Sequence, residues 1–457
     1  MTRFVTVDRD TAYLLPPSVD DWLPKDHLAR FVVEIVDQLD LSEITRQYRG
    51  SGSAAYHPTV MLGLLIYGDA TGVYSSRRIE AATYESIAFR YIAANTQPDH
   101  DSLCTFRKRF LNEIEALFVQ VLCIARQMKL LKLGAIALDG TKIHANASRH
   151  SALSYGHAQK IEAQLETEVK QLLARAQAAD QEPLPKGSSI PAELSRRAER
   201  LAAIRQAKEQ IEVRAAERNA REKADFEAKI KAREDRTAHT GKKPGGKPPA
   251  PPRSGVRPTD QINLTDADSR IMPATGKGFE QNYNAQAAVD TESMLIVATG
   301  MAQVATDKQQ VEPMLKALAG LPEALGSVEQ LLADNGYFSA ANVERCVKAK
   351  IEPLLAARRD GHHPHWEGRF TEPPPLVEPA SAVDRMKHRL KTIQGRKLYG
   401  LRKQTVEPVF GIMAQGHPVK SVMRFRQFLL RGLNSVRGEW NLVTMAWNIK
   451  RMAVMAG

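Results

Sequence analysis

The sequence contains little cysteine and no long uninterrupted apolar run. Its three cysteines, Cys104, Cys123 and Cys346, lie far apart and form no C-x-x-C pair, which argues against a structural zinc site and favours a reducing compartment. The longest apolar run, "VMLGLLIYGDATGV", is interrupted by Asp69 and is too short to span a bilayer. The amino terminus carries acids and prolines where a secretory signal peptide needs an apolar core. We therefore expect a cytoplasmic protein with no membrane partner.

Acidic residues are fewer than basic ones. The 52 Asp and Glu residues against 64 Lys and Arg give a formal net charge of +12. This excess favours a polyanionic partner such as nucleic acid, although a basic protein without a charged partner remains the alternative. With 457 residues, 43% of them hydrophobic and 25% charged, the chain has an ordinary globular composition and room for two or three domains. A disordered protein is excluded.

The composition divides the chain into regions. Residues 1–130 contain short apolar segments with serine or aspartate caps, which predict a helical amino-terminal domain. Residues 157–235 are rich in Ala, Glu, Lys, Arg and Gln, with apolar residues at spacings of three and four, which predicts an inserted helical hairpin or coiled coil. Residues 236–258 are rich in Pro, Gly and Lys and predict a flexible basic linker. Strand patterns in residues 131–156 and 259–457 then predict one α/β core that the hairpin interrupts.

Two predicted strands end on an acid. In "GAIALDGTKIHANAS" an apolar run leads to Asp139, and in "SVEQLLADNGYFS" another leads to Asp334, followed by a helix with Ser339 as its cap. A carboxylate buried without a partner costs several kcal/mol, roughly, so each should face something. Convergent carboxylates repel each other unless a cation lies between them, and Mg²⁺ prefers such oxygen ligands. Alternatively, both acids are simply turn residues, since Asp-Gly and Asp-Asn-Gly favour turns.

A third acid follows in "KLYGLRKQTVEPVFGIM". If this segment is helical, Tyr399, Lys403 and Glu407 share one face and an apolar stripe forms another. Pro408 either kinks this helix or marks its start. Alternatively, Glu407 is a surface residue of this helix without a role in a site.

Polar residues elsewhere add further expectations. Asn284 and Gln286 either line the same site or are strand-interior residues satisfied by their neighbours. Thr306 and Gln309 have capping-box spacing, which predicts that a helix opens there.

The three acids, in this order, resemble those of bacterial insertion-sequence transposases of the DDE type. The resemblance covers nearly the whole chain and includes the stretches "TQPDHDSLCTFRKRF", "GFEQNYNAQAAVD", "LLADNGYFS", "TVEPVFG" and "FRQFLLRGLNSVRGEWNLVTMAWNIKRM". Each motif alone is weak, but their order and spacing together are specific. The resemblance implies an α/β fold, an RNase H-like mixed-sheet catalytic core with an N-terminal all-α domain and an inserted helical hairpin or coiled coil.

The resemblance also implies a reaction and its site. Asp139, Asp334 and Glu407 would bind two Mg²⁺ ions, with Mn²⁺ as a substitute, and the ions would support both DNA cleavage and the joining of 3′ ends to a target. Tyr399 and Arg402, with Glu407, look like the signature around the family's third acid, although Arg402 lies one position further from the acid. The lysine of that signature would be Lys420, after an apparent insertion at residues 414–419.

The resemblance further implies double-stranded DNA as partner, both as terminal inverted repeats and as target. The amino-terminal domain would bind the repeats, a homodimer would form at synapsis, and the protein would associate with the nucleoid. A helix capped by Asp101 would present basic residues as a recognition helix does, while a solvated basic face is the other interpretation. The candidates are Arg107, Lys108 and Arg109 on this helix and Arg77 and Arg78 on an earlier one.

Two other functions remain open. A catalytically inactive descendant would only bind DNA as a regulator, which the altered region before Lys420 favours. A structural protein that dimerises through residues 157–235 would leave the strand-end acids without a purpose.

Overall fold

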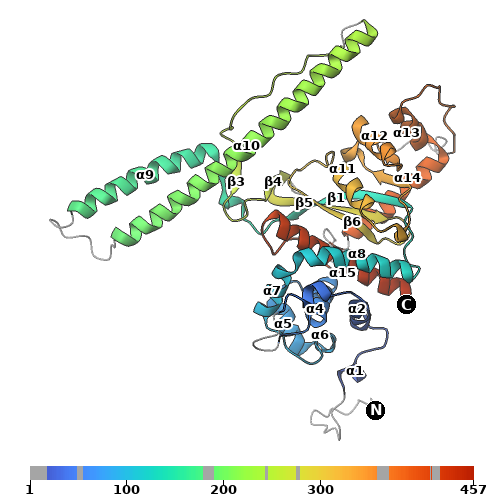
Figure 1. Cartoon of the computed structure of the whole chain (residues 1–457), viewed down its shortest axis with the longest axis horizontal. Helices are drawn as coiled ribbons and strands as arrows, with labels where there is room; N and C mark the ends of the chain where they lie inside the picture. Colours follow the sequence, from blue (N-terminus) through green and yellow to red (C-terminus); the bar gives the residue numbers. More distant parts are fainter. Residues whose placement is uncertain are drawn as a thin grey trace, which may run out of the picture. The chain divides into compact units, whose positions relative to one another are not determined.

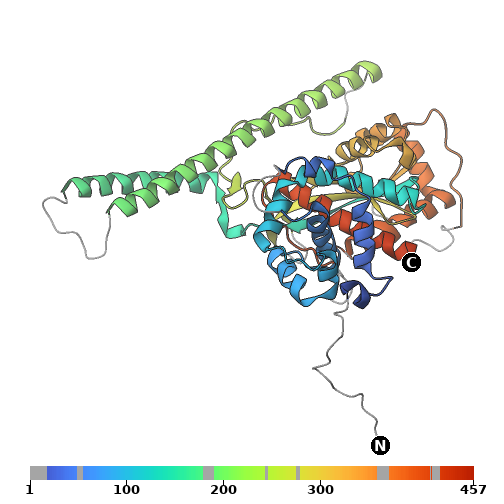
Figure 2. The ribbon, with the colours of Figure 1, turned by 60° about the horizontal axis from the view of Figure 1, so that its bottom comes forward.

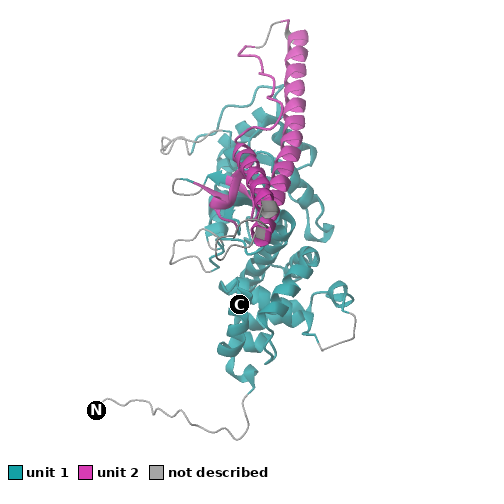
Figure 3. Cartoon of the chain, turned by 90° about the vertical axis from the view of Figure 1, so that its left-hand side faces the viewer, with its two compact units in different colours: residues 1–146, 272–278, 282–457 teal, residues 147–271, 279–281 magenta. Residues whose placement is uncertain are grey.

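The computed structural model describes residues 18–48, 55–178, 190–241, 245–273, 278–357, 370–411, 413 and 423–457. The chain forms two compact units, shown in different colours in Figure 3. Unit 1 comprises residues 1–146, 272–278 and 282–457, and unit 2 comprises residues 147–271 and 279–281. The amino-terminal helices therefore belong to the same unit as the sheet.

A six-stranded mixed sheet forms the centre of unit 1 (Figure 1). In the order β4-β5-β1-β7-β8, β5 runs antiparallel to β1, whereas β7 and β8 run parallel to it, and β6 pairs antiparallel with β5. This arrangement confirms the predicted RNase H-like α/β class. The strands are β1 (Ala135–His144), β4 (Arg270–Pro273), β5 (Phe279–Asp290), β6 (Ile296–Ala302), β7 (Gln330–Ala333) and β8 (Glu352–Leu355).

The parallel strands are short and apolar because helices and neighbouring strands cover them. Leu331, Leu332 and Ala333 of β7 are fully buried, as expected for parallel strands covered on both faces. The longer β5 and β6 form a hairpin, and Asp290 closes its turn by accepting hydrogen bonds from the Ser293 backbone N–H and hydroxyl. The strands predicted in this part of the chain are therefore confirmed, and the turn between them follows Asp290.

Helices surround the sheet on several sides. α14 packs on β1 and β7, α13 on β8 and α14, and α11 on β6 and α12. Ser339 caps α12 by accepting a hydrogen bond from the Asn342 N–H, as predicted. The prediction that Thr306 opens a helix was wrong, because α11 starts five residues later with Gln310 at its N-cap. The bounds are α11 (Val311–Ala319), α12 (Ala340–Lys348), α13 (Ala382–Lys391) and α14 (Ile393–Phe410).

The last helix, α15 (Leu433–Ala456), packs on β6 and on amino-terminal helices, as Figures 1 and 2 show. It is buried on most of its circumference, so its polar groups need partners within the protein. Asn448 accepts from the Ile296 N–H and donates to the Ile296 carbonyl, and the Trp440 indole donates to the Gln286 carbonyl. These bonds fix α15 against the edge of the β5–β6 hairpin.

Short helices form the amino-terminal part of unit 1, as predicted. α4 is apolar on all sides and buried, packs against α2 and α15, and ends at Gly72, whose φ of 83° suits a glycine. α7 is capped by Asp99, which accepts from the Ser102 N–H, rather than by Asp101 as predicted. No described helix is long and apolar enough to cross a membrane. The helices are α1 (Val19–Trp22), α2 (Leu28–Asp37), α3 (Ser42–Thr45), α4 (Pro58–Thr71), α5 (Ser76–Glu85), α6 (Ile87–Ile92), α7 (His100–Arg109) and α8 (Leu111–Gln127).

Unit 2 is built on the predicted helical hairpin. The first arm, α9 (Tyr155–Ala178), packs along the longer α10 (Ile190–Thr240). Glu162 pairs with Arg205 and Lys208 across the two helices, above an apolar seam that includes Leu165 and Ile204. At its base, β2 (Ala152–Ser154) pairs antiparallel with β3 (Gln261–Asn263).

The segment expected to be a flexible linker differs from that prediction where it is described. Its first residues, 236–240, continue α10. Further on, the Arg218 guanidinium donates to the Gly255 carbonyl and forms an ion pair with Asp260. Arg257 pairs with Glu222. The proline-rich segment therefore contacts α10 through Gly255 and Arg257.

Candidate active site

Two of the three predicted acids lie on or directly after neighbouring strands. Asp334 follows the end of β7, as predicted, but the prediction that a strand ends at Asp139 was wrong, because β1 continues to His144. In the parallel pairing of β1 and β7, Leu138 lies opposite Ala333, and the next residues are Asp139 and Asp334. Asp139 Oδ1 accepts a hydrogen bond from the N–H of Gly140 at 2.8 Å. Asp334 ends its strand by capping a short 3₁₀ helix, Asn335–Tyr337.

An arginine connects the third acid to the first. Arg402 on α14 donates from Nη1 to Asp139 Oδ2 and from Nη2 to Glu407 Oε1, both at 3.0 Å. The Arg402 side chain is only 11% exposed, whereas that of Glu407 is 49% exposed. The helix continues through Pro408, so Pro408 is not its start. The packing of α14 on β1 and β7 thus links Glu407 to Asp139 through Arg402.

Burial changes the acidity of Asp139. Removal from water raises the pKa of this carboxyl to about 6. The Gly140 N–H and the Arg402 charge oppose that rise, while the nearby charges of Asp334 and Asp307 add to it. A further cation beside Asp139 would favour its ionised form.

A network of amide side chains lies next to these acids. Asn284 Nδ2 and Gln286 Nε2, both on β5, donate to Asp307 Oδ1 at 2.7 and 2.9 Å. Gln286 accepts in turn from the hydroxyl of Tyr337, just after Asp334. The side chains of Asn284 and Gln286 therefore have their hydrogen bonds satisfied within the strand, and they also lie next to the acids.

The glycine after Asp139 makes room for this network. A Cβ at Gly140 would lie 2.2 Å from Gln286 Nε2, 2.8 Å from Asp307 Oδ1 and 2.9 Å from Asn284 Oδ1. Contacts this short do not occur for a real Cβ, so a side chain here would displace the amides. The Asp-Gly sequence thus serves close packing beside the acid, within a strand rather than a turn.

The donor set suits a hard divalent cation. Asp139, Asp334 and Glu407 offer carboxylate oxygens, which Mg²⁺ prefers. In the described part of the chain, however, no three His, Cys, Asp or Glu side chains are already arranged to hold a metal ion. Arg402 instead holds Asp139 and Glu407. The acids fit the metal by their chemistry, while the arginine supplies the positive charge between two of them.

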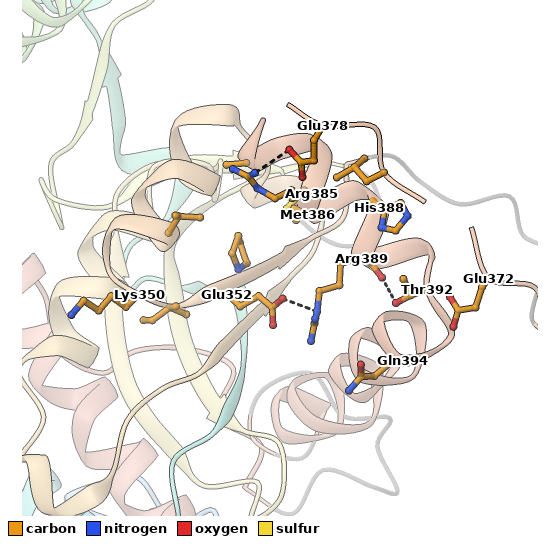
Figure 4. A pocket seen from close by; sticks show the side chains of 15 residues that line it. Lys350, Glu352, Glu372, Glu378, Arg385, Met386, His388, Arg389, Thr392 and Gln394 are labelled. Carbon is orange, nitrogen blue, oxygen red and sulfur yellow. Dashed lines mark hydrogen bonds and ion pairs between the residues drawn. The ribbon is translucent and has the colours of Figure 1, made fainter. Parts of the chain in front are cut away.

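A separate pocket of about 770 Å³ lies beside β8 and α13 (Figure 4). Charged groups in its wall pair with each other, Glu352 with Arg389 and Glu378 with Arg385. None of the three predicted acids lines it. This pocket is therefore not part of the candidate active site.

Comparison with known families points to one class of protein. A transposase domain model (DUF772) matches residues 17–109, and a transposase DDE domain model matches residues 376–453. The two matches support an insertion-sequence DDE transposase. The second match contains Arg402 and Glu407, whereas Asp139 and Asp334 lie outside both matched ranges. No curated protein and no solved structure matched.

The structure places the other residues predicted around the third acid of this transposase as follows. Tyr399 lies close enough to Arg402 to interact with it electrostatically. Lys403, predicted on the same face, is exposed. Lys420 and the apparent insertion at residues 414–419 lie outside the described residues, whereas Met413 just before them is described.

One predicted DNA contact of the transposase needs correction. Arg107 is 5% exposed, and its Nη1 donates to the Tyr74 carbonyl at 3.2 Å. Its charge lies near the buried carboxyls of Asp69 and Glu439, where burial raises both pKa values and Arg107 lowers them. It thus faces the core between α4 and α15 instead of the surface. The other candidates, Arg77, Arg78, Lys108 and Arg109, are exposed.

Replacement of Arg107 should therefore lower the stability of the fold rather than weaken DNA binding directly. We expect Arg107→Met to lower the free energy of unfolding by about 3 kcal/mol, because two buried acids lose the nearby positive charge. Lys108→Met, on the exposed side of the same helix, should change it by less than about 0.5 kcal/mol. Urea unfolding of both variants measures this difference. Equal stabilities would show that the Arg107 charge does not compensate the two acids.

The sequence pattern did not identify Asp307 as a site residue, because its segment was predicted to form the first turn of a helix. The same pattern that identified Asp139 and Asp334 could have indicated it, since Asp307 also lies between a strand and a helix. The strand before it, β6, ends five residues earlier, which hid the pattern.

Proposed function

We propose that this transposase binds the terminal inverted repeats of its own element, cleaves the DNA at their ends and joins the 3′ ends to target DNA. The observation that carries the proposal is the bridge of Arg402 between Asp139 and Glu407, beside Asp334, at the carboxyl end of β7. This bridge links two acids distant in sequence beside the carboxyl end of β7, which Asp334 follows. Phosphodiester cleavage at paired divalent cations requires such a set of carboxylates.

Asp139, Asp334 and Glu407 would hold two Mg²⁺ ions, for which Mn²⁺ can substitute. When bound, these ions would activate the attacking oxygen and stabilise the leaving oxygen. The Gly140 and Gly336 N–H groups orient Asp139 and Asp334 by direct hydrogen bonds.

Arg402 and the residues around it have supporting roles in the proposal. Arg402 fixes Asp139 and Glu407 relative to each other, and Tyr399 lies within electrostatic reach of it. Lys420, outside the described residues, would be the lysine of the family's signature.

DNA contacts would come from the exposed basic residues of the amino-terminal helices. Arg77 and Arg78 lie at the start of α5, and Lys108 and Arg109 at the end of α7, and these two helices pack together. Such residues neutralise phosphates and set affinity and its salt dependence, while base contacts would carry the sequence preference. Since two ends must be brought together, the synaptic complex would be a homodimer.

Cleavage of a labelled duplex that carries one terminal repeat of the element tests the proposal. The full chain should cut at the repeat end with Mg²⁺ or Mn²⁺ but not with Ca²⁺ or a chelator. Asp334→Ala and Glu407→Ala should bind the duplex in a gel-shift assay and not cut it. Glu329→Gln, which removes an exposed acid at the other end of β7, should cut normally.

Two outcomes would contradict the proposal. Binding without any cut by the parent chain would identify an inactive descendant that acts as a DNA-binding regulator. Cutting that survives both alanine variants would place the chemistry elsewhere in the protein.

A further inference from the structure

Asp307 lies in a short segment between β6 and α11 that is fixed by its surroundings. The Asn342 side chain on α12 donates to the carbonyls of Lys308 and Tyr337, both at 2.7 Å, and is itself buried. The Asp307 carbonyl accepts from the Gln310 N–H at 2.8 Å. The backbone on which Asp307 stands is therefore tied to the turn that follows Asp334.

The amide network holds the Asp307 carboxylate in one orientation. Asn284 Nδ2 also donates to the carbonyl of Val304, so this amide must present its nitrogen to Asp307. The Tyr337 hydroxyl donates to Gln286 Oε1, which leaves Gln286 Nε2 to donate to Asp307. Both donors reach the same oxygen, Oδ1. An ionised carboxylate accepts such bonds, and a fixed anion results.

The other oxygen, Oδ2, lies near the second acid. A Cβ at Gly336 would be 3.5 Å from Asp307 Oδ2 and 2.9 Å from Asp334 Oδ1. Asp307 Oδ1 in turn lies close to the position of a Cβ at Gly140, the residue after Asp139. The Asp307 carboxylate is thus located between the two glycines that follow the first two acids. No hydrogen bond to Oδ2 occurs within the described residues.

The charges around Asp307 are not balanced. Arg402 forms ion pairs with Asp139 and Glu407 and interacts electrostatically with Asp334. Within the described residues, no ion pair to Asp307 occurs. Asp139 and Asp307 interact electrostatically as like charges. Carboxylates this close remain ionised together when a cation lies among them. The Asp307 carboxylate, held in place and with one free oxygen, could therefore serve as a ligand of a divalent cation.

We propose that Asp307 is a fourth carboxylate of the metal site and offers Oδ2 to a divalent cation held with Asp139 and Asp334. The inference rests on the proposed function and adds a residue to it. Asn284, Gln286 and Tyr337 then act as positioning residues that aim this carboxylate. All three are buried, which would keep the geometry unchanged when the cation binds.

Calorimetric titration of the full chain with Mn²⁺, without DNA, tests the proposal. Asp307→Asn keeps the shape and keeps an oxygen that accepts both amide bonds, but removes the charge. We expect it to weaken Mn²⁺ binding by about 10- to 100-fold. Asp334→Asn serves as the reference for a lost ligand, and Glu329→Gln, at the opposite end of β7, should bind as the parent does.

The outcomes separate the two proposals. Parent-like Mn²⁺ affinity in Asp307→Asn, together with weakened binding in Asp334→Asn, would overturn the role of Asp307 and leave the proposed function standing. No saturable Mn²⁺ binding by the parent chain would overturn both.

A second measurement avoids substitution in case Asp307→Asn does not fold. Fe²⁺ bound in place of Mg²⁺, with ascorbate and hydrogen peroxide, generates radicals that cut the backbone beside the metal. The parent chain should yield fragments that end near residues 139, 334 and 307, and an excess of Mg²⁺ should suppress all three. Cuts near 139 and 334 without one near 307 would refute the assignment.

Discussion

Asp139→Asn should abolish DNA cleavage at the terminal repeat, with a loss of at least about a thousandfold, or about 4 kcal/mol of transition-state stabilisation. The reason is that Asn keeps the hydrogen bond from Gly140 but loses the charge that a divalent cation requires. Single-turnover cleavage of the labelled duplex at saturating protein measures the loss. Duplex binding should remain, because Asp139 lies on β1 and the exposed basic residues lie on α5 and α7.

The same variant should be more stable than the parent above pH 6 when metal is absent. Because the folded state raises the pKa of Asp139 from 3.8 to about 6, its contribution is fully present below pH 4 and is lost as the pH rises through 6. The loss amounts to about 2–3 kcal/mol, and Asn removes it. Urea unfolding in EDTA at pH 4.5 and pH 7.5 should show the gain only at the higher pH.

The two expected effects of Asp139→Asn, on cleavage and on stability, can fail independently. Cleavage within tenfold of the parent would remove Asp139 from the catalytic set. Equal stability of both proteins at pH 7.5 would show that Arg402 fully compensates the burial of this carboxylate. Glu329→Gln controls for the general effect of removing one acid from the sheet.

Gly140→Ala should damage both stability and activity although it adds only a methyl group. The new Cβ would come within 3.0 Å of Gln286, Asp307 and Asn284. Forcing extra volume into packed surroundings costs about 1–3 kcal/mol. Displacement of the acids by about 1 Å would lower the rate about a hundredfold. Urea unfolding and single-turnover cleavage measure the two effects.

Gly134→Ala is the matched control, since a Cβ at Gly134 meets nothing within 4 Å and this residue directly precedes β1. It should leave both measurements unchanged. If Gly140→Ala behaved like Gly134→Ala, the amide network would be free to move and would not fix Asp307. The proposed fourth carboxylate would then lose its positioning residues.

Some features of the site follow from local sequence. An apolar run predicts a strand, and an acid that follows such a run pointed to Asp139 and Asp334, although β1 continues beyond Asp139 and that carboxyl is buried. The cap at Ser339 and the hairpin turn after Asp290 follow from side chains that bond to backbone close by in the chain. The helix that carries Arg402 and Glu407 follows from residues three to four positions apart.

The sequence by itself therefore determined the order of strands, helices and acids, because these depend on residues near one another in the chain. Only the tertiary structure decided three other points: that Arg107 faces buried acids, that Asp307 lies near Asp139 and Asp334, and that Gly140 makes room for amides of β5. Each depends on the distance between segments far apart in the chain. Packing of the sheet and of α14 sets these distances, and no local pattern encodes them.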